Sequence, residues 1–348
     1  MDTIVGLDIG SHSVKLIELS RDKKGVALLA AGSAPTPPKA LASTVQSDWE
    51  AVAVIVKKLF KDTGTKAEAI NIALPESQVF TRIIEVPALS SRELTSAIKW
   101  EAEQYIPLPL ADVTVDFTVL RDAAATGTNK MDVLLVASPK TLVEKYVSIL
   151  EMSDLSVNAV ETEILATSRA LIKTIPNVKT VMIVSLGAQT TDFAIIRDGV
   201  LAFTRSIAAG GEALSRSLSQ KLGFEMIQAE AFKRTYGLEK DKLEGKIVEA
   251  IKPIMDTIIS EMNRAIAFYQ EKFKGDHIGV VLLSGGTARL PGLVVYLAQA
   301  LGLEVQLANP WVGISRDGRF KVLDTEGAVF TVALVASSFV PFLAGGLR

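Results

Sequence analysis

The chain has 348 residues, of which 49% are hydrophobic and 22% are charged, and its net charge is -2; a chain of this size can bury the cores of two domains or subdomains. The near-neutral charge gives no reason to expect nucleic-acid binding, which would need a basic face, and the absence of cysteine excludes disulfides and thiolate chemistry. The two histidines, His12 and His277, lie far apart in the sequence, which argues against a His-based metal site or catalytic triad.

The first predicted elements are two apolar strands joined by a glycine turn, within Ile4–Glu18. Gly10 has no Cβ, so backbone N–H groups of the turn can approach a phosphate, and small hydroxyl residues beside it add donors. Lys15 would offer a positive charge to the phosphates, and Asp8, at the end of its strand, is placed to hold Mg²⁺ through the waters of the ion. No basic segment precedes the apolar run, so we expect no signal peptide and a cytoplasmic protein.

A third strand is predicted at Gly25–Ala31, followed by a proline-rich loop at Ala34–Lys39 that no helix crosses. Apolar residues at helical spacing then predict a helix with Ser47 as its N-cap: Trp49, Val52, Val56, Leu59 and Phe60. A short buried strand is predicted at Ala69–Leu74.

The next stretch, about Val79–Leu150, has a different order of elements. Alternation predicts a strand at Val79–Val86, and Ser90 with Glu93 forms an S-x-x-E capping box that opens an amphipathic helix. Two strands joined by a soft loop, and then a helix, complete the stretch: Val113–Leu120, Ala123–Asn129, Met131–Ala137 and Pro139–Leu150. The order β, α, β, β, α indicates an inserted subdomain.

Beyond the insert, Val181–Ile195 repeats the strand, turn and strand of the first segment at an offset of 177 residues. The alignment places Gly187 on Gly10 and Thr190 on Ser13. A third strand and a helix follow in the same order, at Val200–Ile207 and from Gly211. A single turn of this kind is a weak signal, but its repetition in the matching place predicts a duplicated phosphate clamp. We therefore expect two similar half-domains that face each other across a cleft.

Two apolar segments remain. Lys246–Phe273 has apolar residues every three or four positions and is expected to be a core helix. Gly327–Leu347 has no charged residue over 21 positions, which is long enough for a membrane anchor. Its threonine, serines, proline and glycines lower its hydrophobicity, so a helix buried in the protein is favoured over an anchor.

Several longer blocks resemble one family. The block Val79–Leu110, VFTRIIEVPALSSRELTSAIKWEAEQYIPLPL, is similar to the signature of the PilM proteins of type IV pilus assembly, which are themselves similar to the cell-division protein FtsA. Shorter blocks carry the same resemblance: RSIAAGGEAL, QAEAFKR, LLSGGTARLPGL and ANPW, which begin at Arg205, Gln228, Leu282 and Ala308. The resemblance covers essentially the whole chain.

The resemblance implies an α/β, actin-like fold, a duplicated ribonuclease-H-like arrangement with an inserted FtsA-type subdomain. Residues 1–78 would begin the first half, residues 79–155 would form the partner-binding insert, and residues 156–348 would form the second half. Residues 156–178 and the C-terminal helix at 326–347 would pack back on the first half.

The resemblance also implies ATP, with Mg²⁺, bound between the two lobes. The first phosphate loop would comprise Asp8, Gly10, Ser11, His12, Ser13 and Lys15, and the second Gly187, Ala188, Gln189 and Thr190. Further contacts would come from Gly210, Gly211, Glu230 and Lys233, and from an adenosine motif of Ser284, Gly285, Gly286 and Thr287. For Glu230 and Lys233, a solvated charge pair on a helix face is the alternative interpretation.

One departure from actin-like ATPases concerns catalysis. Their second phosphate motif begins with an aspartate, whereas this chain has Ser185. Phosphoryl transfer needs charge compensation and a positioned water, so we expect ATP binding with weak or absent hydrolysis. Asp8 remains a possible catalytic residue. Glu161 and Glu163 are possible substitute bases, although acidic residues at a helix N-terminus are favourable for the helix alone.

The resemblance implies an adaptor rather than a turnover enzyme. A groove at the insert, with Arg82, Ile84, Trp100 and Tyr105, would capture the cytoplasmic N-terminal segment of the inner-membrane protein PilN. Further partners would be PilO in the PilN/PilO complex and the pilus motor ATPases, and the chain would lie peripheral to the inner membrane through PilN. Three alternatives remain: a GspL-like component of type II secretion, an active ATPase or phosphotransferase, and an FtsA-like polymerising protein with a membrane tether.

Overall fold

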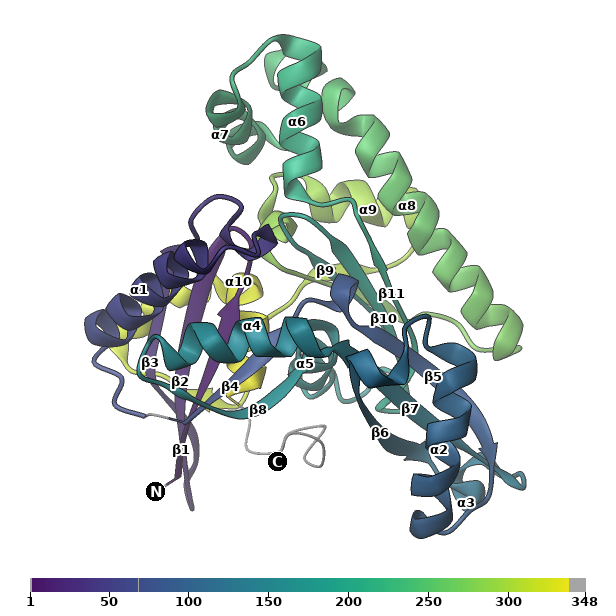
Figure 1. Cartoon of the computed structure of the whole chain (residues 1–348). Coiled ribbons are helices and arrows are strands. Elements are labelled where there is room, and N and C mark those ends of the chain that lie inside the picture. Colours follow the sequence, from purple (N-terminus) through teal and green to yellow (C-terminus); the bar gives the residue numbers. More distant parts are fainter. Residues whose placement is uncertain (1, 68, 338–348) are drawn as a thin grey trace. The chain divides into compact units, whose positions relative to one another are not determined.

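The computed structural model describes residues 2–67 and 69–337, and the chain divides into two compact units. The first unit contains Met1–Ala166, Gly313–Lys321 and Val332–Arg348, and the second contains Thr167–Val312 and Val322–Thr331. Each unit is built on its own central β-sheet, and the first unit carries an additional small sheet (Figure 1).

The central sheet of the first unit has six strands in the order β14-β3-β2-β1-β4-β8. Their bounds are Asp2–Ile9 for β1, Ser13–Asp22 for β2, Gly25–Pro35 for β3, Ala69–Leu74 for β4, Ser156–Thr162 for β8 and Ile314–Ser315 for β14. β1, β2 and β3 form an antiparallel meander, while β4 runs parallel to β1 and β8 runs parallel to β4. In β1, Val5, Leu7 and Ile9 alternate into the core, as period-2 patterning requires.

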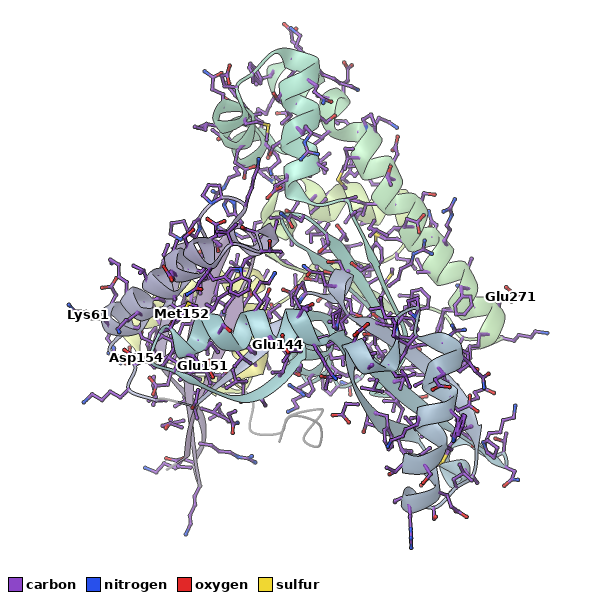
Figure 2. All side chains as sticks on the ribbon, in the orientation of Figure 1. Lys61, Glu144, Glu151, Met152, Asp154 and Glu271 are labelled. Carbon is purple, nitrogen blue, oxygen red and sulfur yellow. The ribbon has the colours of Figure 1, made fainter. Side chains whose placement is uncertain are left out.

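Two helices contribute to that core, α1 at Gln46–Thr63 and α4 at Lys140–Glu151. Their apolar faces are buried, and charged side chains such as Lys61, Glu144 and Glu151 extend from exposed positions (Figure 2). The expected N-cap at Ser47 is wrong: the N-cap is Val45, two residues earlier, so α1 begins at Gln46, and no side chain caps it. The helix ends at Gly64, which adopts the left-handed conformation that glycine tolerates best.

The smaller sheet has the order β5-β7-β6 and carries helix α2. The bounds are Phe80–Pro87 for β5, Ser91–Tyr105 for α2, Val113–Arg121 for β6 and Lys130–Pro139 for β7. The predicted capping box is present, because Glu93 N–H donates to Ser90 Oγ and Ser90 N–H donates to Glu93. A short helix, α3 at Ala123–Thr126, stands where a soft loop was expected, because the Asp122 side chain accepts from Ala125 N–H and caps it.

The sheet of the second unit repeats the plan of the first. Its order is β11-β10-β9-β12-β13, and the bounds are Thr180–Leu186 for β9, Thr191–Arg197 for β10, Val200–Ile207 for β11, Val280–Ser284 for β12 and Val305–Leu307 for β13. The first three strands again form an antiparallel meander, and β12 and β13 continue it in parallel. The predicted duplication is confirmed at the level of sheet topology.

Four helices accompany this sheet: α6 at Gly211–Leu222, α7 at Met226–Tyr236, α8 at Lys246–Lys272 and α9 at Leu293–Leu301. In Figure 1, α8 is the long green helix beside β10 and β11. Ile251, Ile258, Met262 and Tyr269 of α8 are fully buried, so this helix lies in the core as its spacing predicts. Burying such side chains provides roughly 1.5–3 kcal/mol each.

The chain passes between the units at four points, and two of them lie inside α-helices, α5 at Glu163–Ile172 and α10 at Gly327–Ala336. The end of α10 lies close to β1, because a Cβ on Gly6 would meet Ala333 O at 2.1 Å. Asn71 Nδ2 also donates to Ala336 O at 2.8 Å. The expected burial of this apolar segment is therefore seen for α10, and residues 338–347 of the segment lie outside the described residues. No helix in residues 2–67 and 69–337 has the length and hydrophobicity for a membrane span.

Candidate functional site

The second glycine turn connects β9 to β10 and is held from two sides. Gly187 N–H donates to Thr190 O at 2.9 Å, which closes the turn. Gly187 O in turn accepts from Gly211 N–H at 2.9 Å and from Thr287 Oγ1 at 2.9 Å. The turn is thus bound to the start of α6 and to the loop after β12. These three segments are far apart in sequence.

The glycines around this turn are required by close packing. A Cβ on Gly210 would lie 2.6 Å from Ala188 O, and a Cβ on Gly211 would lie 2.5 Å from Thr287 Oγ1. Gly285 has φ of +86°, and a Cβ there would lie 2.4 Å from Leu186 O. Three backbone segments therefore converge where backbone N–H groups can approach an anion.

Lys233 and Glu230 of α7 lie against the start of α6. Lys233 Nζ donates to Gly211 O at 2.7 Å and to Glu230 Oε2 at 2.6 Å, and Ser215 Oγ donates to the same carboxylate at 2.5 Å. The Lys233 side chain is 5% exposed and the Glu230 side chain is 35% exposed, so the pair is partly buried rather than the fully solvated pair considered from the sequence. Burial lowers the pKa of Lys233, and its pairing with Glu230 opposes that shift. These two residues join the glycine segments in one cluster.

The first glycine turn has the same construction inside the first unit. Gly10 N–H donates to Ser13 O at 3.2 Å, and Gly10 O accepts from Thr36 Oγ1 at 2.6 Å. Asp8 and Lys15 face each other on β1 and β2, with Lys15 Nζ donating to Asp8 Oδ2 at 2.8 Å. Both predicted residues are present in the site, but each is paired with the other.

Asp192 is a site residue that the sequence analysis missed. It lies on β10 directly opposite Ser185 of β9, and it is 2% exposed. Burial raises the pKa of Asp192 to about 6, against the hydroxyls of Ser206 and Thr190, which lower it. The signal was available, because the offset that aligns the two turns also places Asp192 on Lys15.

The two glutamates considered as substitute bases lie in different elements. Glu161 is in strand β8, where it is 5% exposed, and only Glu163 begins helix α5. The helix N-terminus therefore explains Glu163 but not Glu161. Burial raises the pKa of the Tyr146 hydroxyl, and the negative charges of Glu163 and Asp8 raise it further.

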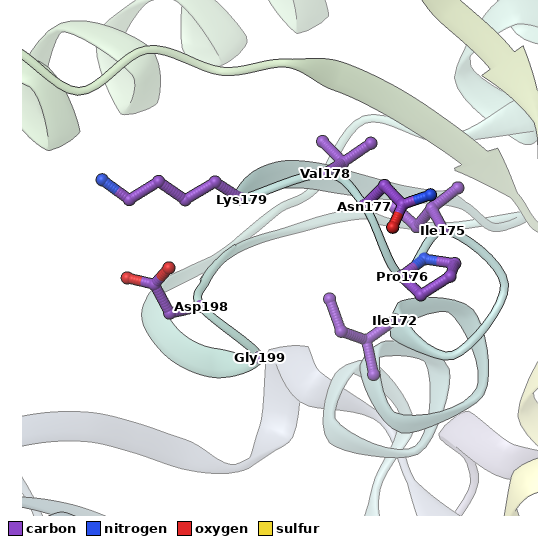
Figure 3. A pocket seen from close by; sticks show the side chains of 8 residues that line it. All are labelled: Ile172, Ile175, Pro176, Asn177, Val178, Lys179, Asp198 and Gly199. Atoms are coloured by element: carbon purple, nitrogen blue, oxygen red, sulfur yellow. The ribbon is translucent and has the colours of Figure 1, made fainter.

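The hollow shown in Figure 3 lies away from the glycine turn. Its volume is about 410 Å³, and it is lined by Ile172, Ile175, Pro176, Asn177, Val178, Lys179, Asp198 and Gly199. These residues precede β9 or form the turn between β10 and β11, whereas Gly187 follows β9. None of the nucleotide-binding, catalytic or partner-binding residues predicted from the sequence lines this hollow.

The predicted partner residues lie on the small sheet and its helix. The Arg82 guanidinium lies over the Tyr105 ring, 4.5 Å from its centroid. Trp100 is 73% exposed, whereas Ile84 is 4% exposed and belongs to the core beneath α2. Trp100 is therefore available to a partner, and Ile84 supports the layer that carries it.

Comparison with known proteins identifies the family. The sequence profile described as "Type IV pilus assembly protein PilM" matches residues 6–336. The chain belongs to the PilM family. A solved structure described as the PilM-PilN type IV pilus biogenesis complex contains a chain with a TM-score of 0.86 and 27% identity, over 96% of this chain and 97% of that one.

Other relatives of this PilM-family chain are actin-like proteins. The cell division protein FtsA of Enterococcus hirae is 25% identical over 88% of this chain and 78% of its own length. The structure of MreB 5 of Spiroplasma citri, bound to AMPPNP, has a TM-score of 0.52 and 14% identity, and it covers 97% of this chain and 95% of that one. The predicted actin-like fold is confirmed by these likenesses and by the two matching sheets.

Proposed function

We propose that this PilM-family chain is a nucleotide-binding adaptor that binds ATP and captures the cytoplasmic N-terminal segment of PilN. The observation that carries the ATP part is the convergence of the second turn, the start of α6 and the loop after β12 through Gly187 O. Gly210, Gly211 and Gly285 each allow a close approach between these segments, which is the arrangement that backbone recognition of phosphates needs.

The residues of the second unit fit such a ligand. Thr190 and the backbone of the turn offer donors for phosphate oxygens, and Lys233, held beside Gly211 O, adds a cation next to the same segment. Ser284 Oγ is buried and makes no hydrogen bond to the described residues, which leaves it available to a ligand. An actin-like relative was solved with AMPPNP, which supports the choice of an adenine nucleotide.

Bound Mg-ATP would bring the charges of its phosphates and metal ion to the site. The residues of this chain would hold the phosphates by backbone N–H groups and would hold the nucleoside against Gly285 and Gly286. Ser185 stands where an aspartate would position metal or water, so we propose slow hydrolysis or none.

The PilN part of the proposal is supported by the solved complex of a relative with PilN. In this chain, Trp100 and the stacked pair Arg82 and Tyr105 are the partner-facing candidates. An extended peptide that gains order on binding would need an apolar anchor of this kind. Attachment to the inner membrane would then follow from PilN, and links to PilO and the motor ATPases belong to the same proposal.

Calorimetric titration tests both parts. The protein is titrated first with Mg-ATP and then with a synthetic peptide from the N-terminus of a PilN protein of the same organism, with and without Mg-ATP. Saturable heats in both titrations are expected, and Lys15→Ala measures the share of the first turn in ATP binding. Absence of peptide binding in both nucleotide states would refute the adaptor role, and absence of nucleotide binding would refute the ATP role.

A further inference from the structure

A polar row crosses the sheet of the second unit just before the glycine turn. Ser206, Asp192, Ser185 and Ser284 lie opposite one another on β11, β10, β9 and β12. Residues paired in this way project from the same face of a sheet. Their chain neighbours, including Val184, Leu186 and Phe193, belong to the core on the opposite face. The row is therefore a distinct polar feature on one face of the sheet.

The row is buried and incompletely paired. Asp192 is 2% exposed, and Ser284 is 1% exposed. Thr190 Oγ1 donates to Asp192 Oδ2 at 3.2 Å. Three oxygens of the row make no well-aligned hydrogen bond to the described residues: Asp192 Oδ1, Ser206 Oγ and Ser284 Oγ. The Ser206 hydroxyl does lower the pKa of Asp192, whereas nothing in the described part of the chain faces Ser284 Oγ in this way. Because buried polar atoms are nearly always paired, three such oxygens in one row indicate a ligand.

The first unit shows what normally compensates a carboxylate in this place. There, Asp8 faces Lys15 across β1 and β2, and the two form an ion pair of 2.8 Å. In the second unit the same two positions hold Ser185 and Asp192. The carboxylate has moved to the neighbouring strand, and the ammonium group is gone. Among the described residues, Asp192 has no ion-pair partner, and a buried carboxylate without one is strongly disfavoured.

We propose that Asp192, and not Asp8, is the carboxylate that faces the metal ion of bound Mg-nucleotide. The proposal rests on the proposed ATP site. One carboxylate with serine and threonine hydroxyls is a set of hard oxygen ligands, which suits Mg²⁺ rather than a softer metal. Asp8 is satisfied by Lys15, whereas Asp192 lies two residues beyond Thr190 of the phosphate turn and still needs a positive charge. The small side chain of Ser185 on β9 leaves room for the ion and adds no second negative charge beside Asp192.

The test measures how Mg²⁺ changes nucleotide affinity. A fluorescent ATP analogue is titrated into wild type, Asp192→Asn and Asp8→Asn, with excess EDTA and with a series of Mg²⁺ concentrations. Asn keeps the size of Asp and removes the charge, and circular dichroism confirms that each variant is folded. In wild type, Mg²⁺ is expected to tighten binding. In Asp192→Asn, the Mg²⁺ concentration for the half-maximal effect is expected to rise about 10–100-fold, the loss typical of removing a partner of a metal site.

The outcomes separate the two proposals. In EDTA, Asp192→Asn should bind nucleotide at least as tightly as wild type, because only the metal-dependent part is removed, and Asp8→Asn should keep the wild-type response to Mg²⁺. An unchanged response in Asp192→Asn, or a lost response in Asp8→Asn alone, would overturn this assignment while leaving ATP binding intact. Failure of wild type to bind nucleotide in either condition would overturn the ATP site itself. Should Asp192→Asn not fold, Ser284→Ala, which lies in the same row, takes its place with a smaller expected shift.

Discussion

At the scale of single residues, the candidate site depends on glycines that allow close backbone approach and on one buried aspartate. Gly210 and Gly285 allow backbones to approach closer than any side chain permits, and Asp192 is buried without an ion-pair partner among the described residues. The glycine positions were predictable, because glycine beside small residues indicates close backbone approach. The state of Asp192 was not predictable from its neighbours in sequence, since it depends on strand pairing with Ser185 and Ser206.

We expect Gly210→Ala to distort the second turn. Its Cβ would lie 2.6 Å from Ala188 O, which is backbone and cannot rotate away. The expected loss of stability is about 1–3 kcal/mol, as for overpacked sites, and nucleotide affinity should fall with it. Chemical denaturation and ATP titration measure the two effects. Gly318→Ala is the control, because a Cβ there meets nothing within 4 Å and Gly318 lies outside the proposed nucleotide site; equal effects of the two substitutions would contradict the close-packing argument.

The raised pKa of Asp192 predicts a pH effect on stability without nucleotide. The folded protein holds this proton up to about pH 6, whereas the unfolded chain loses it near a pKa of about 3.9. Folding therefore loses stability as pH rises from about 4 to above 6. Asp192→Asn removes this loss, so its stability relative to wild type should be roughly 1 kcal/mol higher at pH 8 than at pH 5.

Urea unfolding at the two pH values, without Mg²⁺ or nucleotide, measures this difference. Asp198→Asn serves as the control, because Asp198 is an exposed residue of the turn between β10 and β11. A pH-independent difference between Asp192→Asn and wild type would show that the carboxylate is compensated in the folded protein.

At the scale of elements, each glycine turn is held by the segment that follows its meander. Thr36, after β3, binds Gly10 O, and the start of α6, after β11, binds Gly187 O. The strands and the long core helix followed from periodicity. The start of α1, the helix α3 and the placement of Glu161 in β8 did not, because helix ends depend on local hydrogen bonds that period and propensity leave open.

The small sheet with α2 predicts a separation between stability and partner binding. Trp100→Ala should change the free energy of unfolding by no more than about 0.5 kcal/mol, since the side chain is 73% exposed, and it should weaken binding of the PilN peptide. Ile84→Ala should instead destabilise by about 2–5 kcal/mol, because Ile84 fills the core beneath α2.

Thermal unfolding and peptide titration measure the two quantities for each variant. Val119→Ala, at another exposed apolar position of the same sheet, controls for a general loss of apolar surface. Wild-type peptide affinity in Trp100→Ala would place the partner contact elsewhere.

At the scale of the whole molecule, the sequence predicted the duplicated plan, the insert and the family. These follow from patterns that recur: a turn at a fixed offset, strands of alternating residues and a long signature block. The unit boundaries were harder, because the structure places two of the four inside α5 and α10, where helical periodicity continues without a break.

Nucleotide binding predicts a selective change in thermal unfolding. A ligand that binds only the folded state stabilises it, by about 2.7 kcal/mol at 100 times its dissociation constant. Calorimetry with saturating Mg-ATP should therefore move the transition of the second unit to higher temperature. GTP at equal concentration is the comparison for base selectivity, and an unmoved transition with either nucleotide would contradict the proposed site.

The pairing of Asp8 with Lys15 in one unit, and of Ser185 with Asp192 in the other, has a consequence for the redesign of the chain. The two matching hairpins carry different charges: the first places a carboxylate opposite an ammonium group, so the pair is neutral, and the second places a carboxylate opposite a hydroxyl group. Exchanging the pair in the second hairpin, by Ser185→Asp together with Asp192→Lys, would recreate the neutral pair there. The chain thus contains its own template for a hairpin that needs no cation from outside.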